Sequence, residues 1–462
     1  MAIPRKQLSM MADIVGKNNI LTDIIDLETY AFDSSMYNGL PDVVILPETA
    51  AQVVAVMKLA AQFDIPLLPR GAGSSLSGGA VPVHGGIVLS LTKMQKILEI
   101  DLVNERIIVE PGIINLEVQK ALSKYGYFFA PDPASMKIST IGGNIAENAG
   151  GMHCIKYGNT RDHILGLEVV LANGDVIRTG DMDDEYVSSD LTTLFCGSEG
   201  TFGIVTKAML RLTRMSEKIG TLLAVFSKLD DAGNAVSQIL ANGVLPTSLE
   251  VMNDVITKSL VKYMNVDLPE GDATLLVEVE GIEAEMDAQM SVVRESFVAN
   301  NAITFRMARD QEDRAKIWAA RQGVTGIFGH LGSAQLVHDP SVPVDKIGEM
   351  MRETDKIGKK YNLIICQVCH AGDGNLHPGI MYDVKSAEQH EMAEKASDDI
   401  LRLAISLGGN VSGEHGIGLE KKRFMSWQFN EKEISFMELF KRMFDPSLLL
   451  NRGKILNLES KC

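Results

Sequence analysis

Residues 140–151, TIGGNIAENAGG, decide the fold class of this chain. Four glycines and two asparagines leave the stretch with few bulky side chains. A glycine-rich backbone can approach a bound molecule closely, because glycine has no Cβ. The stretch therefore predicts a ligand site lined by backbone.

A second glycine-rich loop precedes it at residues 70–79, RGAGSSLSGG. A dinucleotide-binding fingerprint that starts at Gly71 meets Leu76 where its third glycine is required. A phosphate-binding P-loop that starts at Gly73 meets Gly79 where its lysine is required. What remains is an anion-binding nest of backbone N–H groups or a plain tight turn, and the loop alone favours neither.

Helical and strand patterns alternate around these loops. Residues 48–64 have helical apolar spacing behind a candidate cap, Thr49, and short apolar runs at 65–69, 85–91, 106–112, 165–177 and 200–212 read as strands. After residue 214 glycine and asparagine become less frequent and helix–strand units appear, and a helical pattern returns over 421–445. We expect an α+β protein with domains at 1–214 and 215–418 and a C-terminal helical segment at 419–462.

Composition narrows the possible partners. The chain has 462 residues and a formal charge of -16, which would repel nucleic acid. Its start lacks the apolar core of a signal peptide, and no apolar run approaches the roughly 18 residues needed to span a bilayer. We expect a cytoplasmic protein with no transmembrane segment and no nucleic-acid partner.

The five cysteines are Cys154, Cys196, Cys366, Cys369 and Cys462. They are too few and too scattered for a disulfide framework, so free thiols are expected. The stretch CQVCH, residues 366–370, matches the pattern of c-type haem attachment. It lies within an apolar run that reads as a buried strand, which favours a structural role.

The two glycine loops carry a family resemblance. RGAGSS, DPASMKISTIGGNIAENAGG, KYG and GSEGTFGIVT, at residues 70–75, 132–151, 156–158 and 197–206, resemble the FAD-binding domain of the vanillyl-alcohol oxidase superfamily. The resemblance implies an α+β fold in which this domain is joined to a ferredoxin-like α+β cap, with the C-terminal helices returning to the FAD domain. It also implies non-covalently bound FAD. The implied FAD contacts are Arg70, Gly71, Ala72, Gly73, Ser74, Ser75 and Gly78 at the diphosphate, then Pro131, Asp132, Ser135, Thr140, Gly143, Asn144, Gly151 and Ile204 along the flavin, and Asn451 near the C-terminus.

Two histidines flank a tight turn in HAGDGNLHPG, residues 370–379. If Asp373-Gly374 forms a two-residue hairpin turn, His370 lies directly opposite His377, with Cβ atoms about 5 Å apart. Two imidazoles so placed could hold a divalent metal, and Glu414 offers a carboxylate as a third ligand. Taken alone, such histidines are more often ordinary polar residues of a surface hairpin.

Together with GEHGIG at residues 413–418, this motif resembles the D-lactate, glycolate and D-2-hydroxyglutarate dehydrogenase branch of the superfamily. The resemblance implies His370, His377 and Glu414 as ligands of Zn²⁺, Fe²⁺ or Mn²⁺, and His415 as catalytic base. Arg321, shortly after Trp318, would bind the substrate carboxylate. Thr325 lies one helical turn further on, as a second substrate residue. The plainer alternative makes Arg321 a solvated helix residue.

Several positions depart from the family pattern. Arg452 stands where the family has proline, next to the implied flavin contact Asn451. The positions that we align with a lysine and an asparagine of the diacid-oxidising members are Val337 and Gly379, although His338 could take a polar role there. A small monoacid is favoured, with D-lactate as the foremost candidate.

The expected reaction is oxidation of a small D-2-hydroxy acid to the 2-oxo acid, with electrons passing to an external acceptor such as an electron-transferring flavoprotein. Glycolate and D-2-hydroxyglutarate remain alternative substrates. Two further readings stay open: a non-catalytic flavoprotein subunit that relays electrons, and a metal-dependent hydrolase in which the histidine pair activates water.

Overall fold

Local capping explains where the first long helix begins. The Thr49 side chain accepts a hydrogen bond from the N–H of Gln52, and α3 (Ala50–Gln62) follows it as predicted. Apolar residues of α3 are buried, among them Val53, Val56 and Met57. The computed structural model describes residues 3–182, 190–264 and 268–458, except the side chain of Thr325; the cysteine Cys462 and the other remaining residues lie outside that description.

The chain forms two compact units. The first comprises residues 1–150, 158–215 and 414–462, and the second comprises residues 151–157 and 216–413. The second unit therefore includes a short stretch, 151–157, that the sequence analysis assigned to the FAD-binding domain. It ends before Glu414, whereas the predicted boundary followed residue 418.

The first unit contains a partly parallel sheet of order β1-β2-β4-β3 and an antiparallel sheet of order β5-β6-β10-β8-β9. A further pair joins β7 and β11. The strands are β1 (Ile20–Leu21), β2 (Val43–Ile45), β3 (Leu67–Arg70), β4 (Ile87–Ser90), β5 (Ile97–Asp101), β6 (Arg106–Val109), β7 (Tyr127–Phe128), β8 (Ile164–Val170), β9 (Val176–Gly180), β10 (Ile204–Arg211) and β11 (Thr213–Arg214).

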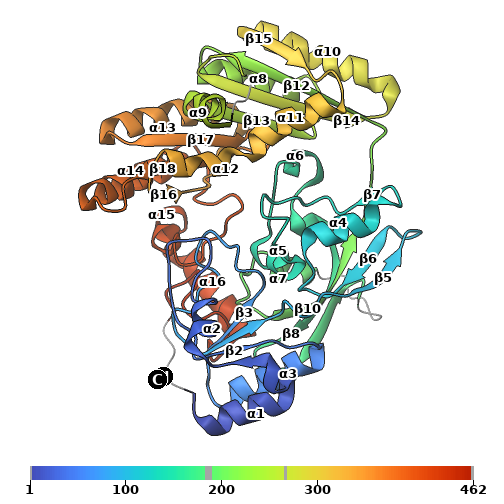
Figure 1. Ribbon diagram of the computed structural model, residues 1–462, viewed down its shortest axis with the longest axis vertical. Coiled ribbons are helices and arrows are strands. Elements are labelled where there is room, and N and C mark those ends of the chain that lie inside the picture. The colour runs from blue at the N-terminus through green and yellow to red at the C-terminus, as the bar shows by residue number, and fades with distance from the viewer. Residues whose placement is uncertain (1–2, 183–189, 265–267, 459–462) are drawn as a thin grey trace. The chain divides into compact units, whose positions relative to one another are not determined.

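Helices α3, α4 (Asn115–Ser123) and α5 (Ile141–Glu147) of the first unit pack against these sheets through apolar residues (Figure 1). The other α-helices of this unit are α1 (Arg5–Val15), α2 (Ile24–Glu28), α7 (Thr192–Phe195), α15 (Met425–Gln428) and α16 (Glu431–Phe444). The last two lie where the sequence predicts a helical C-terminal segment.

An antiparallel sheet of seven strands, in the order β15-β12-β14-β13-β17-β18-β16, forms the centre of the second unit (Figure 1). Its strands are β12 (Lys218–Phe226), β13 (Ser248–Asn253), β14 (Ala273–Gly281), β15 (Ala302–Met307), β16 (Ala334–Val337), β17 (Ile364–His370) and β18 (Asn375–Tyr382). Its helices are α6 (Cys154–Tyr157), α8 (Leu229–Ala241), α9 (Asp254–Met264), α10 (Glu283–Ala299), α11 (Gln311–Gln322), α12 (Val324–Ile327), α13 (Ile347–Tyr361) and α14 (Ala387–Ser406). The mixture of helices and sheets confirms the predicted α+β class.

Both faces of this sheet are covered, because successive side chains on a strand point to opposite sides. One face packs against α8, α10, α13 and α14 through residues such as Leu275, Val277 and Ile380. The other packs against α9, α11 and α12 through residues such as Met252 and Val368. We call the second face the α11 face.

No helix within the described ranges combines the length and the apolar character needed to cross a bilayer.

Candidate functional site

The register of the β17–β18 hairpin differs from the predicted one. His370 pairs with Asn375, and His377 pairs with Val368, so the turn takes residues 371–374 instead of Asp373-Gly374 alone. The predicted direct opposition of the two histidines is wrong. Because the register differs by an even number of residues, both side chains still point to the same face, the α11 face.

The two imidazoles are nevertheless neighbours across the hairpin. Their ring centroids lie 4.9 Å apart with the rings nearly perpendicular, at 82°. Glu414 directly follows Gly413, whose N–H donates to the carbonyl oxygen of Asp339 at 2.7 Å. One potential ligand atom from each of His370, His377 and Glu414 lies within 4.8 Å of the others. Two imidazoles and a carboxylate at this spacing fit a divalent ion such as Zn²⁺, Fe²⁺ or Mn²⁺.

Glu250 in β13 is a site residue that the sequence analysis missed. It lies opposite His370 in the strand register and is 0% exposed. Its Oε1 atom is 2.7 Å from Nδ1 of His370. Burial tends to raise the pKa of this carboxyl, but His370 and Arg321 outweigh that effect and hold the pKa below its ordinary value. Glu250 is therefore an ionised carboxylate in the protein interior.

Arg321 is not the solvated helix residue of the plainer alternative. It lies in α11, and only 12% of its side chain is exposed. Its Nε and Nη2 atoms are 2.7 and 2.6 Å from the same oxygen of Glu250, Oε2. The sheet thus links Arg321 and His370 through one carboxylate. Thr325 lies in α12, and its side chain is outside the described part of the structure.

A second buried carboxylate, Glu278 in β14, holds the preceding turns of α11. It accepts hydrogen bonds from Arg314 Nε at 2.8 Å and Nη2 at 2.7 Å, from Trp318 Nε1 at 2.6 Å and from Thr221 Oγ1 at 2.7 Å. Burial tends to raise the pKa of Glu278, but hydrogen bonds from His153, Arg314 and Thr221 lower it to about 2. Trp318 is therefore part of the anchor of α11.

The two glycine loops meet in the first unit. Thr140 caps α5, and its Oγ1 accepts a hydrogen bond from the N–H of Gly143 at 3.2 Å. A Cβ on Gly71, in the first loop, would collide with that same Oγ1 atom. The first loop can therefore lie against the second only because residue 71 has no side chain.

Buried polar atoms around the second loop fit a polar ligand. The Nδ2 atom of Asn144 and the Oγ atom of Ser139 are buried without a hydrogen-bond partner among the described residues, and these residues are 2% and 4% exposed. An Oε2 atom of Glu147 is in the same state. Native proteins rarely leave such atoms unsatisfied, so the loop suits a cofactor with hydrogen-bonding groups such as FAD.

Other implied FAD residues form hydrogen bonds to the backbone of the first loop and its neighbours. Arg70 donates to the carbonyl oxygens of Ala80 and Phe32 at 2.6 and 2.8 Å. Asn451 donates to the carbonyl oxygen of Gly79 at 3.0 Å. Lys454, which the sequence analysis did not single out, donates to Gly78, Gly79 and Val81 at 2.6, 3.2 and 2.7 Å. Arg70 and Asn451 thus fix the loop backbone.

The remaining implied contacts differ in what they offer. The carbonyl oxygen of Pro131 accepts from Asn115 at 3.0 Å, and that of Ser135 accepts from Ser139 at 2.8 Å. Ile204 is 1% exposed and lies in the core with β2, β4 and α3, so little of this residue is accessible to a ligand. Gly151 belongs to the short stretch grouped with the second unit.

The stretch that carries His415 is held in the first unit. The His415 carbonyl oxygen accepts from Ser77 Oγ at 3.0 Å. The N–H groups of Ile417 and Gly418 donate to the two carboxylate oxygens of Glu199 at 2.7 and 2.8 Å. Glu199, within GSEGTFGIVT, is another residue to which the sequence analysis gave no role.

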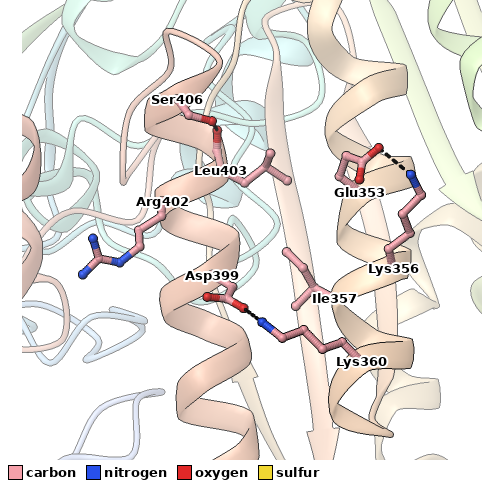
Figure 2. Close-up of a pocket in the computed structure, with 8 residues that line it drawn as sticks. All are labelled: Glu353, Lys356, Ile357, Lys360, Asp399, Arg402, Leu403 and Ser406. Atoms are coloured by element: carbon pink, nitrogen blue, oxygen red, sulfur yellow. Dashed lines mark hydrogen bonds and ion pairs between the residues drawn. The ribbon is translucent and has the colours of Figure 1, made fainter.

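A groove of about 610 Å³ between α13 and α14 lies on the other face of the seven-stranded sheet (Figure 2). Its charges are largely paired, with Lys356 2.8 Å from Glu353 and Lys360 2.7 Å from Asp399. It contains neither histidine of the pair, and we do not assign the candidate site to it.

Comparison with protein families identifies the family of the chain. Residues 215–455 match the C-terminal domain of FAD-linked oxidases, and residues 41–180 match an FAD-binding domain. The chain belongs to the FAD-linked oxidases, and it is a flavoprotein oxidoreductase of the vanillyl-alcohol oxidase type.

Its relatives define the branch. Glycolate oxidase subunit GlcD of Bacillus subtilis is 38% identical over 94% of this chain and 93% of that protein. A D-lactate dehydrogenase of Anaerostipes hadrus is 30% identical over 97% of each chain. A 4-ethylphenol oxidase from Gulosibacter chungangensis has the same fold, with a TM-score of 0.81 at 18% identity over 98% of each chain. The chain is an FAD-linked oxidoreductase of the glycolate oxidase and D-lactate dehydrogenase type.

Proposed function

We propose that this protein oxidises a small D-2-hydroxy acid, with D-lactate as the first substrate to test, and that it requires a divalent metal. The observation that carries the proposal is the pair of neighbouring imidazoles of His370 and His377 on the same sheet face as Arg321. In a 2-hydroxy acid the carboxylate and the hydroxyl are on adjacent carbon atoms. A guanidinium can bind the carboxylate while a neighbouring metal ion binds the hydroxyl.

In this proposal each residue has a distinct task. Arg321 binds the substrate carboxylate through the guanidinium edge formed by Nη1 and Nη2, because Nε and Nη2 face Glu250. His370, His377 and Glu414 hold the metal. His415 accepts the hydroxyl proton of the substrate as general base.

The cofactors supply the remaining chemistry when they are bound: FAD accepts a hydride, and a divalent metal lowers the pKa of a coordinated hydroxyl. Asn144 and Ser139 would hydrogen bond to FAD through the buried atoms described above. We expect FAD to be non-covalent, because we find no attachment residue in the sequence. An external acceptor, such as an electron-transferring flavoprotein, would then reoxidise the flavin.

A direct test is anaerobic mixing of the purified holoprotein with D-lactate. The flavin absorbance should bleach, and treatment with a chelator should abolish bleaching while FAD stays bound. Adding Zn²⁺ or Mn²⁺ should restore it. A yellow protein that no 2-hydroxy acid bleaches would favour the electron-relay alternative, and a colourless active hydrolase would overturn the proposal.

Glycolate is the second candidate substrate, because the relative at 38% identity is a glycolate oxidase subunit. Glycolate lacks the methyl group of lactate and makes the same carboxylate and hydroxyl contacts. The ratio of kcat/KM for the two acids decides between them.

A further inference from the structure

We infer that Glu250 is a positioning residue that holds both the metal ligand His370 and the carboxylate-binding Arg321, so that one buried side chain couples the metal site to the substrate site. The inference rests on the function proposed above. It extends that function to a residue in the interior of the sheet.

The hydrogen bond to His370 determines which imidazole nitrogen can bind metal. Glu250 forms an ion pair with Arg321, and a carboxylate paired in this way only accepts hydrogen bonds. Nδ1 of His370, 2.7 Å from Oε1 of Glu250, is therefore the donor. The lone pair of neutral His370 is then on Nε2. Metal-binding histidines commonly have such a carboxylate behind them, which sets the tautomer and the ring orientation.

The other oxygen of Glu250 orients the guanidinium. Both Nε and Nη2 of Arg321 face Oε2, which leaves the Nη1–Nη2 edge for an anion. Arg321 needs this partner, because a buried guanidinium without a carboxylate is costly. The same partner fixes the direction in which its remaining N–H groups point.

Glu278 provides a matched comparison on the neighbouring strand. It too is a buried carboxylate on the α11 face, and it too binds an arginine of α11, Arg314. Its partners Arg314 and Trp318 are not among the proposed metal or substrate ligands. A purely structural role for Glu250 would make the two glutamates equivalent in their effect on metal binding.

The experiment compares Glu250→Gln with Glu278→Gln in the full-length, FAD-loaded protein, after circular dichroism has shown that both are folded. Metal affinity is measured by titrating Zn²⁺ against a chromophoric chelator, without substrate. We expect Glu250→Gln to bind Zn²⁺ about 10- to 100-fold more weakly than wild type. An amide NH₂ facing Nδ1 would move the imidazole proton to Nε2. Glu278→Gln should keep the wild-type Zn²⁺ affinity.

A second measurement tests whether Glu250 also affects substrate binding through Arg321. At saturating metal, KM for D-lactate should remain raised in Glu250→Gln, because metal does not restore the orientation of Arg321. Arg321→Lys should raise KM and keep Zn²⁺ affinity, because Glu250 still faces His370. If Glu250→Gln does not fold, Glu250→Asp keeps the charge but is too short to reach both partners, and it should weaken Zn²⁺ binding in the same direction.

The possible outcomes separate the inference from the proposed function. Equal Zn²⁺ affinity of wild type and the folded Glu250 variant would overturn the inference alone. Equal losses in the Glu250 and Glu278 variants would also overturn it, since both would then act only through the fold. A wild-type enzyme that oxidises D-lactate without any metal would overturn the metal requirement of the proposed function.

Discussion

Val337 in β16 lies directly opposite Gly379 in β18. From the sequence we aligned these two positions with polar residues of diacid-oxidising family members, and the structure places them side by side. Gly379 follows His377 by two residues on the same strand, so both belong to the α11 face. Neither Val337 nor Gly379 offers a side-chain hydrogen-bond donor or a cation for a second carboxylate. His338, which we considered as a polar substitute, instead contacts Ser397 of α14 at 2.6 Å on the opposite face.

We therefore expect D-lactate to be oxidised with a higher kcat/KM than D-2-hydroxyglutarate, and L-lactate to be a poor substrate. Val337→Lys should reduce the difference in kcat/KM between the two D-acids, because the lysine adds a cation that could bind the second carboxylate. Steady-state assays with an artificial electron acceptor give kcat/KM for the three acids in both proteins. A clear preference of the wild type for the diacid would show that Val337 and Gly379 do not determine which substrate is accepted.

Alanine variants should separate metal ligands from the base. His370→Ala and His377→Ala should each lose bound metal, because the pair of imidazoles is broken. His415→Ala should keep the metal and lose roughly 10²- to 10⁴-fold in turnover, the usual contribution of a positioned base. Elemental analysis and single-turnover flavin reduction report the two properties. Metal loss in His415→Ala with retention in His370→Ala would reverse the assigned roles.

The anchor of α11 should make stability depend on pH. The pKa of Glu278 is about 2 in the folded protein against an ordinary 4.5, a difference that corresponds to roughly 3 kcal/mol of folding free energy. Because the folded-state pKa is lowered, this stabilisation is present above pH 4.5 and is lost as the pH falls towards 2. Glu278→Gln should thus lower the melting temperature at pH 7 and do so less at pH 3. An equal effect at both values would rule out the ionised carboxylate as the cause.

Lys454 should control retention of FAD. Its ammonium group donates to three backbone carbonyl oxygens of residues 78–81. Lys454→Met keeps the length of the side chain but removes a charged hydrogen-bond donor from each of these carbonyl oxygens, at about 1.5–3 kcal/mol each. We expect partial loss of FAD on gel filtration, measured by the ratio of absorbance at 450 and 280 nm. Exposed Lys432→Met is the control, and identical FAD content in both variants would argue against this role.

Particular residues show what the sequence could and could not predict. The cap at Thr49 and the buried strand around Cys366 follow from local patterns, and the structure confirms both. The hairpin register was missed because a dipeptide that favours a two-residue turn does not exclude a longer one. His370 and His377 still came together because alternation along the strand constrains the face more strongly than the exact pairing.

Glu250 and Glu278 could not be assigned from the sequence, because their partners are distant along the chain. Each lies in a buried strand, SLEVMN or ATLLVEVEG, and a carboxylate within such a strand was the available signal. A charged residue in a buried strand calls for a partner. Identifying Arg321 and Arg314 as those partners required knowing that α11 covers these two strands.

The two-point attachment of α11 also bears on the entropy of ligand binding. Arginine side chains carry about 2 kcal/mol of rotamer entropy, which a flexible guanidinium loses when it captures an anion. Arg321 loses that freedom during folding, because Glu250 fixes its guanidinium while Glu278 fixes Arg314 and Trp318 earlier in the same helix. If Arg321 binds the substrate carboxylate as proposed, little of the binding free energy is needed to order the arginine. A ligand as small as a three-carbon acid makes few contacts, and this preorganisation leaves more of their free energy for binding.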